Sequence, residues 1–224
     1  MVSIDTVYQK VLAFANKEQR GYITPQEFNL YADQAQKEIF EQYFYDLNQF
    51  IKVPSNSEEY SDIVHNINEK IAVFEETATS GARLIPGVYR LGTVFYNGIE
   101  IEEVQQNEIL YLNQSYLTRP TNNRRVYVRV SSDLIEIHPP ISDEELQYTY
   151  VRLPKKPRWA YFVVGGKALH DTNATATTNF ELHASEETEL VYKILKYAGL
   201  SMKRNDIAQG GQGLESLQTQ QEKQ

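Results

Sequence analysis

Cysteine is absent from all 224 residues, and this absence excludes several kinds of chemistry. Without cysteine the chain has no disulfide, no thiolate metal site and no thiol nucleophile. No stretch approaches the length needed to span a bilayer, and residues 1–10 lack the apolar core of a signal peptide. We therefore expect a soluble protein that works in, or is made in, a cytoplasm and does not contact a membrane.

Basic residues are outnumbered, with 22 Lys and Arg against 30 Asp and Glu, for a net charge of −8. A protein whose main task is to grip phosphate backbones needs a basic face, so this balance argues against that function. A local basic stripe could still face DNA inside a channel, although solvated strand edges or ion pairs explain the same residues. These cations are Arg124, Arg125, Arg129, Arg152, Lys155, Lys156 and Arg158.

Apolar residues make up 41% of the chain and aromatics 12%, which is enough for one or two domains with hydrophobic cores. Residues 1–80 are predicted to be helical. Apolar side chains recur at helical spacing from Ile4 to Ala15, which predicts a first helix. A second helix is predicted to follow it. A third helix is predicted from about Ser57 to Phe74.

The second helix has the clearest start signal. Thr24 can cap it, Pro25 suits the first helical position, and Glu27 can complete a capping box. The helix is predicted to run to about Phe50. Its aromatic residues spread over more than one face, which is typical of a helix that contacts more than one neighbour.

Residues 77–86 are predicted to be a linker. After them, apolar side chains recur at every second residue, as in a strand, and no longer at helical spacing. Asn97-Gly98 predicts a hairpin with a type I′ turn. We expect residues 85–182 to form an antiparallel β domain. Its predicted strands are 94–96, 99–101, 125–130, 134–137, 146–153 and 161–164.

The chain is predicted to end in a helix and a polar tail. Ser185 begins the helix over 183–200, and Gly199 is predicted to end it. Residues 206–224 are rich in Gln and Gly and should be disordered in isolation. The predicted fold is therefore α+β: a helical region 1–80, an antiparallel β domain 85–182, a C-terminal helix 183–200 and a flexible tail 206–224.

Residues 16–27 have the layout of a calcium-binding EF-hand loop between two helices. Asn16, Glu18, Gly21, Ile23 and Glu27 would fill loop positions 1, 3, 6, 8 and 12. Arg20, however, falls at position 5, where an oxygen ligand is required, and the helix start explains the loop's end without a metal. A calcium-binding helical interaction module is the alternative function.

Catalytic patterns are not found in the sequence. The four histidines, at 65, 138, 170 and 183, show no metal-ligand spacing, and no Gly-x-Ser-x-Gly motif occurs. The acidic runs 102–103 and 143–145 lie in polar stretches, and the glycine cluster 210–213 lacks the strand and helix of a phosphate loop. We predict no catalytic, cofactor-binding or metal-binding residue, no cofactor, and no enzymatic activity.

The sequence resembles virion structural proteins of short-tailed bacteriophages of the crAss-like group, in particular the ring proteins between portal and tail. The first of the three stretches that carry the resemblance is the most specific. The stretches are Lys17–Asn29 with Ala35–Phe40; Val126–Val128 and Ile135–Ile137 through Tyr150–Trp159; and Phe180–Glu187 with Ile194–Gly199.

The resemblance implies a homo-oligomeric ring of the head-to-tail connector or tail, twelvefold to match the portal. Such a ring joins portal to tail and leaves a channel for DNA. Its partners would be copies of itself, the portal protein and other connector or tail rings, with non-specific contact to genomic DNA. The protein would reside in the virion after assembly in the host bacterial cytoplasm.

Overall fold

The structure, a computed structural model, describes residues 1–16, 23–52, 58–79, 84, 86–141, 146–171, 176–201, 212–213 and 215–217. The chain is α+β and divides into two compact units. Unit 1 comprises Met1–Val73 and Pro154–Gln224, and unit 2 comprises Phe74–Leu153. The expected β domain, 85–182, therefore lies partly in each unit, because the chain completes the large sheet in unit 2 and returns to unit 1 at Pro154.

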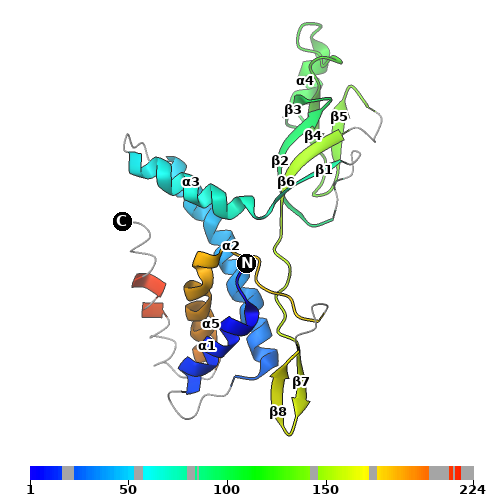
Figure 1. The fold of residues 1–224 in the computed structure, drawn as a ribbon. Helices are drawn as coiled ribbons and strands as arrows, with labels where there is room; N and C mark the ends of the chain where they lie inside the picture. The colour runs from blue at the N-terminus through cyan, green and yellow to red at the C-terminus, as the bar shows by residue number, and fades with distance from the viewer. Residues whose placement is uncertain are drawn as a thin grey trace. The chain divides into compact units, whose positions relative to one another are not determined.

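Unit 1 is built mainly from helices (Figure 1). The long helix α2 packs against α3 and α5, and α1 also packs against α5. The helices are α1 (Ile4–Asn16), α2 (Pro25–Lys52), α3 (Glu58–Ala72), the short 3₁₀ helix η1 (Ala184–Glu186) and α5 (Glu187–Ser201).

The predicted apolar stripes of α1 and α5 are buried in the core of this unit, together with residues of α2. Ile4, Val7, Val11 and Ala15 of α1 are buried. The predicted stripe of α5 is buried throughout, at Leu190, Val191, Ile194, Leu195 and Ala198. Both helices follow the rule that an amphipathic helix buries one face.

The predicted capping box at the start of α2 is confirmed. The Thr24 backbone N–H donates to Glu27 Oε2 at 3.0 Å, and the Glu27 N–H donates to Thr24 Oγ1 at 3.3 Å. Two backbone donors that the first helical turn would otherwise leave unsatisfied are thereby paired. The Thr24 hydroxyl also donates to Glu27 Oε2 at 2.7 Å, and this hydrogen bond, together with the one from the Thr24 N–H, lowers the pKa of Glu27.

An extended segment, residues 154–160, lies along α2 and leads into the hairpin β7 (Tyr161–Val164) and β8 (Lys167–His170). Side chains of α2 hold this segment. Asn29 accepts from Trp159 N at 2.8 Å and donates to Trp159 O at 3.2 Å. Two turns along the same helix, Gln36 donates to Lys155 O at 2.8 Å and accepts from Glu181 N at 3.1 Å. Side-chain amides thus satisfy backbone groups that have no neighbouring strand.

Unit 2 contains one six-stranded sheet in the order β1-β6-β2-β3-β4-β5. All of its neighbouring strands are antiparallel except the parallel pair β3 and β4, so the sheet is mainly antiparallel, as predicted, with one parallel pair that makes it mixed. The strands are β1 (Glu75–Thr79), β2 (Val88–Tyr96), β3 (Ile99–Glu103), β4 (Val126–Arg129), β5 (Ile135–His138) and β6 (Leu146–Arg152).

Strand β4 is buried on both faces of this sheet. Tyr127 points into the main core of unit 2, whereas Val126 and Val128 pack with Ile109 of the short helix α4 (Glu108–Gln114). This arrangement follows from the alternation of side chains along a strand. The crossover through α4 also explains the parallel pair, because parallel neighbours cannot be joined by a tight turn.

The predicted hairpin between β2 and β3 is confirmed. Asn97 and Gly98 have φ values of 51° and 75°, and Tyr96 pairs with Ile99. A type I′ turn requires positive φ at both central residues, which asparagine and glycine tolerate best.

Three local predictions were wrong. Residues 77–79 belong to β1 and not to a linker: they pair with β6, and the side chains of β1 are mostly exposed, so no alternation marks this strand. Helix α4 lies inside the region predicted to be β. Gly199 does not end α5, which continues to Ser201.

No described helix is both long and apolar enough to cross a membrane. Of the predicted flexible tail, the described residues 212–213 and 215–217 are helical, and the remainder lies outside the described residues.

Candidate functional site

A cluster of charged side chains lies between α2, α5 and the C-terminal segment of unit 1. At its centre is Lys193, whose side chain is 1% exposed. Its ammonium group contacts Glu38 at 3.1 Å, Glu189 at 3.4 Å and Glu215 at 2.6 Å. Lys196, one turn away on the surface of α5, contacts Glu215 at 3.1 Å and Glu38 at 3.9 Å. This group of five residues is called the Lys193 cluster below.

The Lys193 cluster is held in its charged form. Burial disfavours the charge of Lys193, but the hydrogen bond to Glu215 and the charges of Glu189 and Glu38 outweigh it and raise the pKa of Lys193. Burial likewise opposes ionisation of Glu38. The hydrogen bond from Tyr197 and the charges of Lys193 and Lys196 together outweigh that effect and lower the pKa of Glu38. A buried cation that is paired and hydrogen-bonded in this way fixes the positions of the groups around it.

Tyr197 completes the cluster on the Glu38 side. Its hydroxyl donates to Glu38 Oε2. Burial, followed by the hydrogen bond to Glu38 and its negative charge, raises the pKa of Tyr197 to about 12. The phenol is therefore a neutral hydrogen-bond donor at physiological pH and supplies no reactive phenolate.

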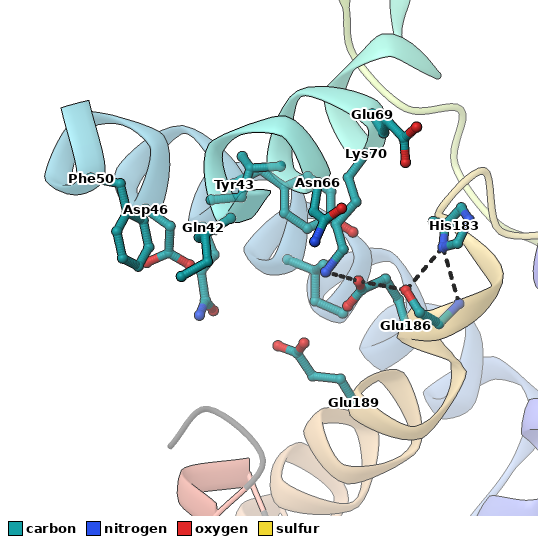
Figure 2. Close-up of a pocket in the computed structure, with 14 residues that line it drawn as sticks. Gln42, Tyr43, Asp46, Phe50, Asn66, Glu69, Lys70, His183, Glu186 and Glu189 are labelled. Atoms are coloured by element: carbon teal, nitrogen blue, oxygen red, sulfur yellow. Dashed lines mark hydrogen bonds and ion pairs between the residues drawn. The ribbon is translucent and has the colours of Figure 1, made fainter. Parts of the chain in front are cut away.

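A pocket of about 420 Å³ lies between α2, α3, η1 and the first turn of α5, and Glu189 of the Lys193 cluster is one of its lining residues (Figure 2). Its walls combine apolar residues such as Ile39, Phe50 and Ile63 with polar ones. Lys70 pairs with Glu186 at 2.6 Å, and the Glu186 side chain is 1% exposed. This pair anchors α3 to the start of α5.

The serine and histidine in this pocket are engaged in capping η1. Ser185 Oγ lies 2.9 Å from His183 Nδ1, and Ser185 N donates to the same nitrogen at 3.3 Å. Ser185 Oγ also donates to Glu186 Oε1 at 3.1 Å. Because His183 and Ser185 lie two residues apart at a helix start, these contacts form a cap, as expected for polar side chains at this position.

The remaining histidines lie apart from one another. His65 is on α3 beside Glu69, His138 ends β5 beside Glu136, and His170 ends β8, stacked on Trp159. Within the described part of the chain, no group of three or more His, Asp or Glu side chains is placed to hold a metal ion.

The cations that could face DNA are divided between the two units, and several have local partners. In unit 2, Arg125 donates to Pro139 O, Arg129 to the carbonyls of Ser131 and Ser132, and Arg152 to Glu76. In unit 1, Lys155 lies 4.0 Å from Glu181. These contacts account for the four residues as parts of the fold, and DNA contact by any of the basic residues stays a prediction.

Calcium binding by residues 16–27 also stays a prediction, since residues 17–22 lie outside the described residues. Glu27, the candidate ligand at loop position 12, accepts hydrogen bonds from both the backbone N–H and the hydroxyl of Thr24. Because Arg20 would also place a cation at the ion, we expect isothermal titration with Ca²⁺ to show no binding at micromolar concentration. Micromolar binding that is abolished by Glu27→Gln would contradict this expectation and support the alternative function.

Two exposed apolar surfaces stand out, one on each unit. The first, called the α4 patch, consists of Leu110, Tyr111, Tyr116 and Leu117, and Tyr116 and Leu117 are 95% and 91% exposed. The second, called the hairpin patch, consists of Phe162, Val164 and Leu169, which share one face of the β7–β8 hairpin because side chains alternate along a strand. Large apolar side chains that gather on a surface mark a place where another molecule binds.

Sequence reasoning found neither the Lys193 cluster nor the α4 patch. A single lysine on the apolar stripe of a helix was the available signal for the cluster, because residues 190, 191, 193, 194 and 195 are all buried. The α4 patch could not be predicted from the sequence, because helix α4 itself was not predicted.

Comparison with models of known protein families gives no match, and comparison with curated proteins gives none either. These comparisons therefore show no family for the chain.

Proposed function

We propose that this chain is a structural virion protein that forms an oligomeric ring in the head-to-tail connector or tail of a tailed phage. The ring joins portal to tail and leaves a channel for DNA, with twelve copies to match the portal. The presence of two separate apolar patches, one per unit, carries this proposal. The resemblance of three stretches of the sequence to phage ring proteins supports it.

A closed ring requires two different surfaces on each copy, because head-to-tail contacts join one surface to another. The α4 patch and the hairpin patch belong to different units and differ in local structure. Interface cores are enriched in aromatic residues, and both patches contain them, with Tyr111 and Tyr116 in one and Phe162 in the other. We therefore assign both patches to contacts with neighbouring copies.

The charge of the chain fits a channel wall that does not bind DNA tightly. With a net charge of −8, the protein as a whole repels phosphate. This repulsion favours the passage of DNA through the channel over tight binding of DNA to its wall. Arg124, which is two-thirds exposed beside Glu102, is a side chain that could touch the passing DNA non-specifically.

We expect the double variant Tyr116→Asp, Leu117→Asp to abolish ring formation without unfolding the chain. Both side chains are almost fully exposed in the single chain, so their replacement removes little buried area and changes stability by less than about 0.5 kcal/mol each. Negative-stain electron microscopy of the protein, alone and with portal and tail proteins, would report rings. Thermal unfolding by circular dichroism would report the fold.

The matched control is Val130→Asp with Leu134→Asp, which adds the same charge to unit 2 at two partly exposed apolar residues outside the patch. This control should still form rings. A wild-type chain that stays monomeric even beside portal and tail proteins would contradict the proposed function. Rings of the Tyr116, Leu117 variant would contradict the role of the α4 patch.

A further inference from the structure

Among the described residues of the C-terminal segment of unit 1, Glu215 binds α5 through its carboxylate. Glu215 Oε1 contacts Lys193 and Glu215 Oε2 contacts Lys196, so the two oxygens bridge two ammonium groups of α5. In Figure 1 this segment, drawn in red, lies beside α5. The other described residues of the segment, 212, 213, 216 and 217, are exposed. For the described residues of the segment, the binding site is therefore a pair of lysines that holds a carboxylate.

The site stays charge-balanced when this carboxylate leaves. Without Glu215, Lys193 and Lys196 still face Glu38 and Glu189, which gives two positive and two negative charges. Removing a partner from a buried charge is strongly destabilising only where it leaves that charge uncompensated. Here Lys193 retains Glu38 at 3.1 Å and Glu189 at 3.4 Å. Glu215 is thus a ligand that can be exchanged without breaking the pairing of α2 with α5.

We propose that the Lys193–Lys196 site binds the Glu215 segment of a second copy of this chain, so that neighbouring copies exchange C-terminal segments in the ring. The proposal rests on the proposed function. Its chemical basis is the match between a paired-ammonium site and a carboxylate carried by every copy. The exchange needs no new contact, because the site and its ligand are those already seen within one chain.

The length of the chain permits this exchange. An extended chain spans at most about 3.3–3.6 Å per residue, so the stretch from 201 to 212, where the described helical residues begin, can bridge up to about 36–40 Å. That span exceeds the diameter of a helix with its side chains, about 10–12 Å, several times over. Exchange of an identical segment between copies costs little, since each copy loses and regains the same contact.

Cross-linking between introduced cysteines tests the exchange, and the natural lack of cysteine makes each introduced thiol unique. Ser216→Cys places a thiol beside Glu215, and Glu41→Cys places one on an exposed position of α2 one turn from Glu38. Both substitutions retain all five members of the Lys193 cluster. Full-length chains carrying one substitution each are mixed, assembled with portal and tail proteins, and treated with a flexible bismaleimide.

We expect covalent pairs that join one variant to the other in the assembled sample. Glu215→Gln in the Ser216→Cys chain should reduce their yield to background, because the amide cannot pair with two ammonium groups. Lys196→Glu in the Glu41→Cys chain should reduce it as well. Glu215→Lys in the first chain together with Lys196→Glu in the second should restore the yield. Circular dichroism melts of each variant check that the fold is retained.

The outcomes separate this inference from the proposed function. A companion sample uses one chain that carries both Ser216→Cys and Glu41→Cys. If that chain forms rings but only links within itself, and the mixed single variants give no pairs, segment exchange is overturned and the ring is left intact. Pairs between chains that persist unchanged with Glu215→Gln would also overturn it. Links between chains without any ring would support exchange while contradicting the ring, and the absence of both would contradict the two proposals together.

Discussion

Replacement of Trp159 by alanine is expected to lower the free energy of unfolding by about 3–5 kcal/mol, the usual cost of deleting a large buried aromatic side chain. Trp159 is 2% exposed and is the largest fully buried side chain of the protein's described part. Its ring stacks on Tyr161 and His170 at centroid distances of 5.8 and 5.6 Å and contacts Tyr8 at 4.1 Å. It therefore joins the β7–β8 hairpin to α1, and its loss opens a cavity where these elements meet.

Urea unfolding followed by circular dichroism would measure this change, since the variant has no tryptophan to report by fluorescence. Trp159→Phe is the informative second variant. It keeps an aromatic ring but loses the hydrogen bond from Trp159 Nε1 to Asp5 Oδ1 at 2.9 Å, and should cost less. Phe162→Ala, at a half-exposed position of the same hairpin, should be close to neutral. A loss of less than about 1 kcal/mol for Trp159→Ala would contradict a core role for this residue.

Gln36→Leu is expected to destabilise unit 1 by about 2–4 kcal/mol although it makes the core more apolar, because it leaves the buried Glu181 N–H and the partly buried Lys155 carbonyl without this partner. Gln36 is completely buried, and its amide pairs with Lys155 O and Glu181 N. Leucine has a similar volume but neither donates nor accepts. The cost should fall on the extended segments 154–160 and 180–182, which depend on α2 for hydrogen bonds.

Amide hydrogen exchange would locate this effect, with the Glu181 amide losing protection before the amides of α5. Gln49→Leu is the matched control, since Gln49 lies on the same helix, is exposed, and bonds to Tyr45. It should change stability by less than about 0.5 kcal/mol. Full protection of the Glu181 amide in the Gln36→Leu variant would show that the backbone finds another partner.

The same two α2 amides show why a site can be invisible in a sequence. Asn29 and Gln36 read as ordinary polar residues of a helix, yet both side chains replace the partners that a neighbouring strand would give to residues 155, 159 and 181. Nothing local marks them, since their partners lie 119 to 145 residues away in the chain. Lys193 is a similar case, because its burial depends on carboxylates from α2 and from the C-terminal segment.

Local chemistry by itself determined the α+β class, the starts and buried stripes of the helices, and the Asn97-Gly98 hairpin. These features depend on neighbours within a few residues: a capping side chain, a helical period, or a turn that needs positive φ. Only the tertiary structure decided the parallel pairing of β3 with β4, the place of β1 in the sheet, and the charge balance around Lys193. Each of these joins residues that are distant in sequence, and the energy of such contacts depends on burial that no short segment of the chain specifies.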